Sequence, residues 1–464
     1  MKVTSRLFSA LPRIRPTPSF VTHDVFLDKY SDIPKDQKSS TQVTIRGRVS
    51  SKRASGQKLF FFDTASSGTK IQVVGTNPST DVATAFKGLG RGDHVQVSGI
   101  PGRTERGEVS IYATEVIRLS QCHHRIPEQY EDYAKRMTKR HVDFMVNESS
   151  RQVILKRSKL ISTLRAELDR RGFVELETPI LQSSASGATA RPFETKSVAG
   201  LDLQLKIAPE LALKRAVIGG FDRVYEIGKS FRNEGISRRH NPEFTTCEFY
   251  QAYAGLEDLI GLTKELLISL EASLDRKIDP QLFRKDHFQR LDFTSTIEDA
   301  IGQELPTDQS ALLKLFERLK IDRPEDISVA NLYDVLSGRY IEPLCDLPTF
   351  VVNLPSALSP LAKSTDGISH RFELYVNRME LVNAYEEEND PQLQRQKFKA
   401  QSDGRLTVEE EDYCNALEWG LPPTGGFGMG IDRLVMLLTN TTRINETLLA
   451  GGIMNQPRNK VKSS

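Results

Sequence analysis

The 464-residue sequence lacks any apolar run of eighteen residues, so no membrane-spanning helix is expected. It has only four cysteines, far apart and with no CxxC pair, a pattern that favours neither a zinc site nor a disulfide framework. It also lacks a strong net charge, since 63 Lys and Arg against 61 Asp and Glu give +2. A content of 38% hydrophobic and 27% charged residues is typical of a globular protein, and the length suggests two or three domains.

Acidic residues are absent from the first 23 positions, which contain Lys2, Arg6, Arg13 and Arg15 among several Ser and Thr. A basic, hydroxyl-rich and acid-free start is typical of an organelle transit peptide. We therefore expect residues 1–23 to be a mitochondrial presequence that directs the protein to the mitochondrial matrix. The alternative is a frayed terminus on a cytoplasmic protein.

Residues 24–125 are expected to form a small β-barrel. Five short alternating or apolar runs, at 41–53, 57–66, 69–75, 93–103 and 108–120, are separated by Gly, Ser and Pro, and a helix at 83–89 would suit an OB-fold. The stretch 41–120 contains eleven Lys or Arg against six Asp or Glu, which favours a polyanionic partner. Strand alternation must turn at least one of Phe60, Phe61 and Phe62 away from the core, where its ring can stack on a base.

A polar connector at 126–150 is expected to lead into a second domain at 151–455, with a polar tail at 456–464. This domain would begin with an amphipathic helix, ended by Gly172 and followed by a strand that runs to Pro179. The apolar positions at near-helical spacing are Ile154, Leu155, Leu160, Ile161, Leu164 and Leu168. The stretch 256–346 contains further amphipathic helices, and its pattern indicates no chemistry.

The segment from Gly219 to Tyr253 alternates apolar and charged residues in a way that predicts a binding surface. As strands, it would place Arg232 and Glu234 on one face, and Glu248 and Tyr250 on one face. A polar loop at 238–241, which includes His240 and Asn241, lies between the two pairs. The surface therefore carries both signs of charge.

A second hairpin is predicted at 372–382, with its turn near Asn377 and Arg378. Pairing of Tyr375 with Glu380 would put Glu373 and Glu380 on the same face. Two neighbouring carboxylates repel each other unless a cation lies between them, and Mg²⁺ bound to phosphate oxygens is the usual candidate. The alternative is two exposed glutamates on an outer sheet face.

Alternation would place the next polar positions of this hairpin, Asn383, Tyr385 and Glu387, on the opposite face. For them to join the same pocket, a bulge or bend is required between Glu380 and Asn383.

Glycines at 425, 426, 428 and 430 would let the backbone approach a ligand closely, just before a helix expected to begin near Ile431. Arg433 in its first turn opposes the helix dipole, a cost that binding a phosphate would offset. A glycine-rich loop alone is weak evidence for nucleotide binding, and Arg232, Glu234 and the carboxylate pair strengthen it.

These motifs resemble those of class II lysyl-tRNA synthetases over nearly the whole chain, from the barrel to about Leu449. The helix and strand before Pro179, FRNEG with HNPEF at 231–244, and GMGIDR at 428–433 match the three class II motifs in order. The stretches APEL at 208, TTCEFYQAY at 245, SPLAK at 359 and ELVNAYEEENDP at 380 resemble the lysine branch in particular. The resemblance implies an α+β catalytic domain with an antiparallel sheet flanked by helices, an N-terminal OB-fold barrel that binds the anticodon, and a homodimer.

The resemblance also implies roles for individual residues. Arg232 and Arg433 would be the catalytic residues, and Glu373 and Glu380 would hold Mg²⁺. Phe61 and Gln72 would bind the anticodon. The implied ATP-binding residues are Arg232, Glu234, His240, Asn241, Phe244, Glu380, Leu381, Gly430 and Arg433. The implied lysine-binding residues are Gly187, Glu210, Glu248, Tyr250, Asn383, Tyr385, Glu387 and Gly428.

The residue types support lysine as the amino acid, because a long ammonium side chain needs acceptors at the far end of its pocket, and three glutamates and two tyrosines supply them. The expected substrates are ATP, L-lysine and tRNA(Lys), with Mg²⁺ and with neither zinc nor a disulfide. Three alternatives remain: an aspartyl or asparaginyl synthetase, a protein-lysylating paralogue, which typically lacks the barrel, and a non-catalytic tRNA-binding protein.

Overall fold

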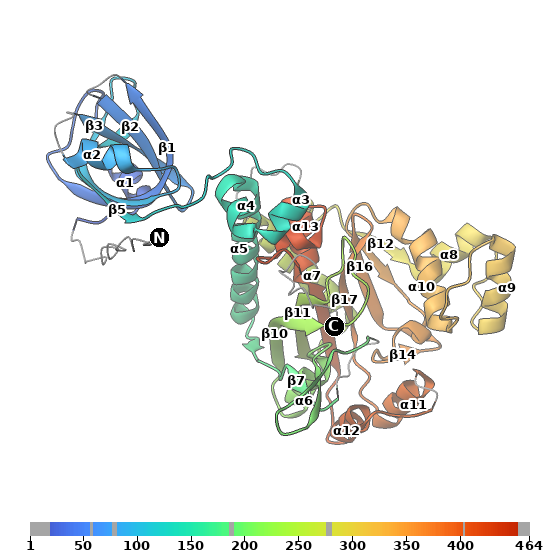
Figure 1. Cartoon of the computed structure of the whole chain (residues 1–464). Coiled ribbons are helices and arrows are strands. Elements are labelled where there is room, and N and C mark those ends of the chain that lie inside the picture. Colours follow the sequence, from blue (N-terminus) through green and yellow to red (C-terminus); the bar gives the residue numbers. More distant parts are fainter. Residues whose placement is uncertain are drawn as a thin grey trace, which may run out of the picture. The chain divides into compact units, whose positions relative to one another are not determined.

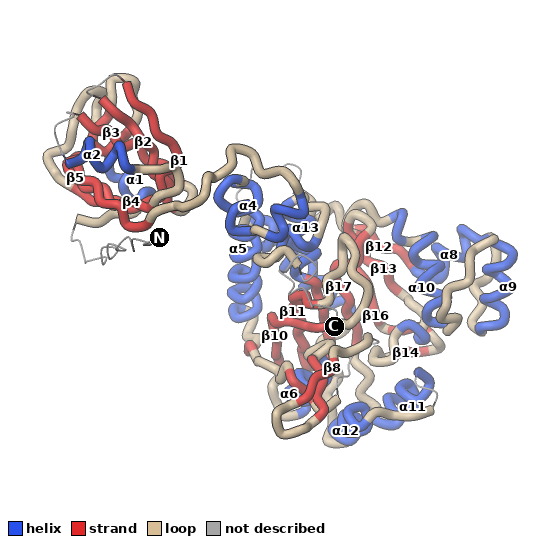
Figure 2. The backbone as a smooth tube through the Cα atoms, in the orientation of Figure 1, coloured by secondary structure: helices blue, strands red, loops and turns tan. Residues whose placement is uncertain are grey.

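The computed structural model describes residues 19–55, 59–76, 81–184, 190–274, 281–401 and 404–452 (Figures 1 and 2). The expected presequence lies largely outside the described residues, and the expected tail at 456–464 lies wholly outside them. The chain divides into two compact units, one of Met1–Glu131 with His141–Glu148 and the other of Asp132–Arg140 with Ser149–Ser464. The stretch expected to be a polar connector contains helices α3 (Tyr133–Thr138) and α4 (Arg140–Val146) and the start of α5 (Glu148–Arg170).

The first unit is built on a closed barrel with strand order β1-β2-β3-β5-β4, which confirms the predicted OB-fold. The strands are β1 (Val43–Ser55), β2 (Leu59–Ser66), β3 (Thr69–Thr76), β4 (His94–Arg103) and β5 (Val109–Ser120). The predicted helix is α2 (Asp81–Gly88), and a further helix, α1 (His23–Tyr30), precedes the barrel. Phe26 and Tyr30 of α1 are buried in the barrel core. The composition of the N-terminal region did not predict this helix.

The three consecutive phenylalanines of β2 divide as alternation requires. Phe60 and Phe62 are buried and pack against Phe86 of α2, with ring centroids 4.3 and 6.3 Å away. Phe61 points away from this core and is half-buried. The prediction that one of the three leaves the core is confirmed.

The second unit is built on an eight-stranded sheet of order β12-β13-β16-β17-β18-β11-β10-β6, in which the six central strands pair antiparallel with one another. The edge strands β12 and β6 pair in parallel with β13 and β10. The strands are β12 (Gln289–Asp292), β13 (Thr349–Val352), β16 (Arg371–Val376), β17 (Met379–Glu386), β18 (Thr424–Gly430), β11 (Glu243–Ala252), β10 (Arg223–Phe231) and β6 (Val174–Glu175).

One face of this sheet is covered by α5, α7 (Leu256–Ala272) and α13 (Ile431–Thr439), which share one apolar core with it (Figure 1). Alternate residues of β11, such as Cys247 and Phe249, enter that core, so Glu248 and Tyr250 lie on the other face. The helix α5 is as predicted except at Leu155, which is 51% exposed. The polar residues of β11 expected in a binding site therefore lie on the face opposite this core.

The strand expected to run to Pro179 was predicted too long, because β6 ends at Glu175. The backbone N–H of Leu176 still donates to the Tyr225 carbonyl of β10, at 2.8 Å, and the partner changes after that. The backbone N–H of Thr178 donates to the Glu226 carboxylate, at 3.1 Å, and not to a neighbouring strand.

The remaining elements surround the sheet. Helices α8 (Phe293–Ile301), α9 (Gln309–Leu319) and α10 (Val329–Tyr340) share a core with residues of β13 and β16, and α6 (Glu210–Ile218), α11 (Pro391–Gln401) and α12 (Val408–Leu417) share another with residues of β10 and β11. Two small sheets consist of β7 (Leu181–Gln182), β9 (Asp202–Leu205) and β8 (Glu194–Lys196), and of β14 (Ser364–Thr365) and β15 (Ile368–Ser369). Within the described ranges, no helix is long and apolar enough to cross a bilayer.

Candidate active site

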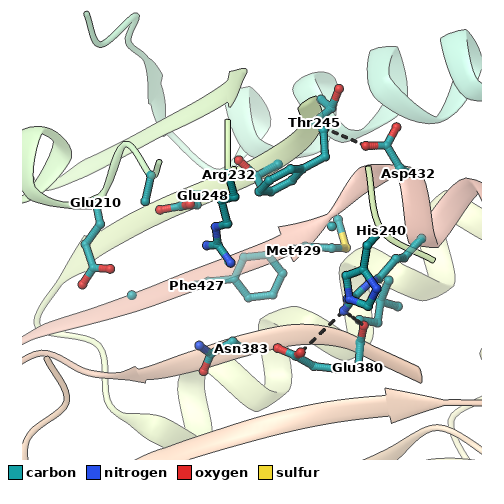
Figure 3. Close-up of a pocket in the computed structure, with 18 of the residues that line it drawn as sticks. Glu210, Arg232, His240, Thr245, Glu248, Glu380, Asn383, Phe427, Met429 and Asp432 are labelled. Carbon is teal, nitrogen blue, oxygen red and sulfur yellow. Dashed lines mark hydrogen bonds and ion pairs between the residues drawn. The ribbon is translucent and has the colours of Figure 1, made fainter. Parts of the chain in front are cut away.

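A cavity of about 390 Å³ lies over the central strands of the second unit and brings together residues that are far apart in the sequence (Figure 3). Its size suits a small-molecule site. Of the residues expected in this unit, Gly187 lies outside the described residues and Glu373 lies beside the cavity without lining it. The others all line it: Glu210, Arg232, Glu234, His240, Asn241, Phe244, Glu248, Tyr250, Glu380, Leu381, Asn383, Tyr385, Glu387, Gly428, Gly430 and Arg433.

The hairpin of β16 and β17 delivers one wall of the cavity. It turns at Asn377 and Arg378, both with positive φ, and pairs Tyr375 with Glu380 as predicted. The register then shifts, because Leu374 pairs with Val382 and leaves Leu381 unpaired. This bulge turns Asn383 and Tyr385 to the side of Glu380, so the required bulge is confirmed.

Arg232 and Glu234 line the cavity, but not as neighbours on a strand face. Strand β10 ends at Phe231, and Glu234 lies in an irregular loop, so the predicted strand was too long here as well. A last backbone hydrogen bond, from Arg232 N–H to the Pro242 carbonyl at 2.8 Å, ends the ladder. Beyond it the loop with Pro242 can no longer pair, since proline has no N–H to donate.

The Arg232 guanidinium lies over the Phe244 ring, 5.3 Å from Cζ to the ring centroid. Its Nε is buried and has no hydrogen-bond partner within the described part of the chain. A buried donor without a partner costs free energy unless a ligand accepts from it, so this nitrogen fits an anionic ligand.

At the other end of the cavity, Arg433 in the first turn of α13 links β17 to the loop before β11. Its Nη1 donates to the Glu380 carbonyl, at 2.7 Å, and its Nη2 lies 2.9 Å from Nε2 of His240. Burial and the nearby Arg433 charge lower the pKa of His240, which favours the neutral ring. Arg433, together with Arg239, which also lines the cavity, and the N-terminus of α13 suit a polyphosphate at this end.

Four carboxylates gather beside this end of the cavity: Asp334 and Glu342 near Glu373 and Glu380. Burial, and then the Glu380 charge, raise the pKa of Asp334. Burial, and then the charges of Asp334 and Glu380, raise the pKa of Glu342. The Glu373 carboxylate is held by Arg371 and by the Tyr375 hydroxyl, which donates to it at 2.8 Å. Such a set of hard oxygen ligands fits Mg²⁺.

In the described residues, however, no three or more His, Cys, Asp or Glu side chains are arranged to hold a metal ion by themselves. Glu373 and Glu380 would therefore need oxygen ligands from a nucleotide to complete the coordination. This is the usual way in which Mg²⁺ is bound, with one or two carboxylates and substrate phosphates.

The cavity's acidic end is formed by Glu210 at the start of α6, Glu248 on β11 and Glu387 after β17 (Figure 3 labels the first two). Burial, reinforced by the Glu210 charge, raises the pKa values of Glu248 and Glu387 to about 8. The Tyr385 hydroxyl donates to Glu210 at 2.8 Å, and the Tyr250 hydroxyl donates to Glu248 at 3.2 Å. Glu210 and Glu387 are buried and Glu248 is half-buried, and gathering three carboxylates in this way is costly, which points to a cationic ligand.

Glu387 has a hydrogen-bond partner at only one of its two carboxylate oxygens among the described residues. One of its oxygens accepts from Lys214, whereas Oε1 is buried and has no partner among the described residues. Gly426 leaves room for this oxygen, since a Cβ on Gly426 would lie only 1.9 Å from it. The glycine-rich strand thus makes space at the acidic end of the cavity.

The sequence reasoning missed three charged residues that organise the site, namely Lys214, Arg371 and Asp432. Lys214 is fully buried between Glu210 and Glu387, and Asp432 accepts from the Thr245 N–H at 2.7 Å and from Arg157 at 2.5 Å. Lys214 follows Glu210 by four residues, a helical spacing that could have suggested the ion pair. Arg371 donates to Asn383 at 2.8 Å, a contact that only the hairpin register reveals.

In the barrel, the two expected anticodon-binding residues lie on adjacent strands. Phe61 is paired across the ladder with Arg53, whose Cζ lies 5.3 Å from the ring centroid. Gln72 is buried, and its amide donates to Glu108 at 2.6 Å and accepts from Ser110 at 3.0 Å. The Phe61 ring can stack on a base. Gln72 would have to give up one of its present hydrogen bonds, to Glu108 or Ser110, to bind a base.

Comparison with known proteins agrees with both units. Residues 132–450 match the family model of tRNA synthetases class II (D, K and N), and residues 43–119 match that of the OB-fold nucleic acid binding domain. Similar proteins include "Lysine--tRNA ligase, mitochondrial" of Schizosaccharomyces pombe, 42% identical over 97% of this chain and 92% of the relative. They also include "Lysine--tRNA ligase cla4" of Cladosporium cladosporioides, 41% identical over 92% of this chain and 79% of the relative, and "Lysine--tRNA ligase" of Dehalococcoides mccartyi, 40% identical over 88% and 86%. The chain belongs to the class II tRNA synthetase family (D, K and N).

Proposed function

We propose that this protein is a lysine–tRNA ligase that activates L-lysine with ATP and transfers it to the 3′-terminal adenosine of tRNA(Lys). The observation that carries the choice of amino acid is the acidic end of the cavity, where the buried Glu210 and Glu387 lie with the half-buried Glu248. Relatives that are named lysine–tRNA ligases support the same choice. A site for an acidic amino acid would need cations there.

ATP would bind across the middle of the cavity. Arg232 would hold the α-phosphate with its unpartnered Nε, and Phe244, which already packs against Arg232, would stack on the adenine. Glu234 would accept from the adenine amino group. Arg433, His240 and Asn241 would lie along the triphosphate, and Leu381 and Gly430 would complete the nucleotide site.

Lysine would bind with its carboxylate toward Arg232 and its ammonium side chain toward the acidic end. The free Oε1 of Glu387 and the hydroxyls of Tyr250 and Tyr385 would accept from the ammonium. Asn383, Gly428, Glu210 and Glu248 would complete the lysine site, with Gly187 from outside the described residues. An analogue without the ammonium would leave carboxylates unpaired, so discrimination against it is large.

The chemistry then needs no nucleophile from the protein. The lysine carboxylate attacks the α-phosphorus in line, pyrophosphate leaves, and the tRNA hydroxyl later takes the acyl group from the adenylate and releases AMP. Arg232 and Arg433 would stabilise the charge that develops on the phosphates. Glu373 and Glu380 would hold Mg²⁺, which supplies further charge neutralisation when bound.

The barrel would bind the anticodon through a stack on Phe61 and a hydrogen bond from Gln72. Arg53, which lies beside the Phe61 ring, would add a cation next to the stacked base. We further propose that the protein is a homodimer. Light scattering of the purified protein tests this, because a molar mass equal to that of one chain would exclude a dimer.

We also propose that the protein acts in the mitochondrial matrix. The acid-free N-terminal composition and the name of the Schizosaccharomyces pombe relative support this, whereas the name of the 39% identical relative from Encephalitozoon cuniculi, "Probable lysine--tRNA ligase, cytoplasmic", supports the alternative. A fluorescent protein fused to residues 1–30 should accumulate in mitochondria. A cytosolic signal would contradict the proposal.

The activity is tested by ATP–pyrophosphate exchange with each of the twenty amino acids. Lysine should support exchange, and no other amino acid should reach a comparable rate at the same concentration. Exchange with aspartate or asparagine in place of lysine would assign the protein to another branch of its family, and no exchange at all would indicate a non-catalytic protein.

A further inference from the structure

Lys214 is an ammonium group that the protein itself contributes to the acidic end of the cavity. It is fully buried on α6, and its Nζ donates to Glu210 at 2.7 Å and to Glu387 at 2.8 Å. It also lies 5.1 Å from the centroid of the Tyr413 ring on α12. Two of the three glutamates expected to recognise lysine are therefore already held by a lysine of the chain.

We propose that Lys214 is a positioning residue of the lysine pocket, which offsets part of the negative charge of Glu210 and Glu387 and holds both carboxylates in the orientation that receives the substrate. The proposal rests on the proposed lysine-activating function. Lys214 does not line the cavity, so it acts on the substrate only through these two carboxylates.

The count of charges supports this role. In the form that binds an ammonium, with the three carboxyls deprotonated and Lys214 protonated, the acidic end has a net charge of minus two. A bound lysine has two ammonium groups, and its carboxylate would face the separate cation Arg232. The pocket and its substrate would then be balanced, whereas without Lys214 a third negative charge would remain buried and would take up a proton.

Geometry supports it as well. Lys214 occupies one oxygen of Glu387 and leaves Oε1 without a partner in the described residues, so the carboxylate presents a single acceptor. Lys214 and the Tyr385 hydroxyl both donate to Oε1 of Glu210, which fixes that side chain from two directions. A lysine fixed between two carboxylates selects one orientation of each.

The groups around Lys214 favour its protonated, charged form. Burial alone would lower the pKa of Lys214, but Glu210 and Glu387 raise it well above the usual value. The titratable or charged groups around Lys214 and its two carboxylates are Glu210, Glu387, Tyr413, Tyr385, Glu248, Tyr250 and Arg232. In the range from pH 6.5 to 9 the groups expected to titrate are therefore the carboxyls of Glu248 and Glu387.

The test is the KM for lysine of Lys214→Met in pyrophosphate exchange, measured from pH 6.5 to 9. At pH 7.5 we expect this KM to rise at least tenfold and the KM for ATP to stay within twofold. The pH at which the KM for lysine levels off should move upward by at least one unit, because the carboxyls lose the cation that favours their ionised form. If Lys214 only supported the fold, thermal stability would fall and the pH profile would keep its position, which would overturn the proposal.

A matched control is Lys397→Met. Lys397 also belongs to a largely buried ion pair, with its Nζ 2.6 Å from Glu388, the neighbour of Glu387 in the chain, but it lies outside the cavity. The KM for lysine and the pH profile of Lys397→Met should stay as in the wild type.

If Lys214→Met does not fold, Lys214→Gln replaces it, because the amide can still donate to the carboxylates without a charge. The same shift of the pH profile is expected. Absence of lysine-dependent exchange in the wild type would contradict the proposed function and not this inference.

Discussion

At the scale of single residues, the acidic end of the cavity couples lysine binding to pH. Burial, reinforced by Glu210, raises the pKa values of Glu248 and Glu387 to about 8, so both bind protons near neutrality. The substrate ammonium, with a pKa of about 10.4, remains charged and needs them ionised. We predict that lysine affinity increases as pH rises from 6.5 to 8.5, by up to about tenfold per unit for each proton released. Calorimetric titration with lysine measures this, and an affinity that is flat or falls over this range would contradict it.

A second prediction concerns a single methyl group. In Gly426→Ala the new Cβ would lie 1.9 Å from Oε1 of Glu387, the oxygen expected to bind the ammonium. We expect the KM for lysine in pyrophosphate exchange to rise at least tenfold, with the KM for ATP within twofold. Gly261→Ala in α7 is the control, because nothing lies within 4 Å of its Cβ position and alanine favours a helix. Equal kinetics for Gly426→Ala and Gly261→Ala would show that Glu387 does not limit lysine binding.

At the scale of elements, Asp432 ties three of them together. From the first turn of α13 it accepts from the Thr245 N–H of β11 and from Arg157 of α5, and it is 1% exposed. Asp432→Ala would leave Arg157 without its carboxylate, and loss of one partner of a buried pair costs about 3–5 kcal/mol. Urea unfolding measures this loss, and a change below about 1 kcal/mol would contradict it. Glu257→Ala, which removes the exposed pair with Arg290, should cost no more than about 1 kcal/mol.

The elements also show what the sequence can and cannot predict. The hairpin of β16 and β17 was predictable in turn, register and bulge, because its alternation is local and the position of Glu380 fixes the pairing. The end of β10 was not, because the backbone pairing of Arg232 stops at Pro242, ten residues further along the chain. Lys214 was missed as a partner of Glu387, since the two are 173 positions apart and only the packed sheet brings them together.

At the scale of the whole molecule, the two units divide the proposed reaction, and one pair of variants separates their contributions. Arg232→Ala should abolish pyrophosphate exchange, because the α-phosphate loses its guanidinium. Phe61→Ala should leave exchange unchanged and weaken charging of tRNA(Lys), because one base loses its stack, worth about 1–3 kcal/mol. Phe20→Ala is the matched control for Phe61, since Phe20 is an exposed aromatic of the same unit that also has an arginine, Arg46, over its ring.

The reason for separate effects lies in how the chain is built. The barrel has its own closed core, and the sheet unit has its own, so removal of an outward-facing ring from one should not alter the catalytic cavity in the other. We therefore expect the KM for tRNA(Lys) to rise by about 5- to 150-fold in Phe61→Ala, the equivalent of one lost stack, and to stay at the wild-type value in Phe20→Ala. Equal losses of exchange and charging in Phe61→Ala would mean that the barrel contributes to adenylate formation, and the division between the two units would be wrong.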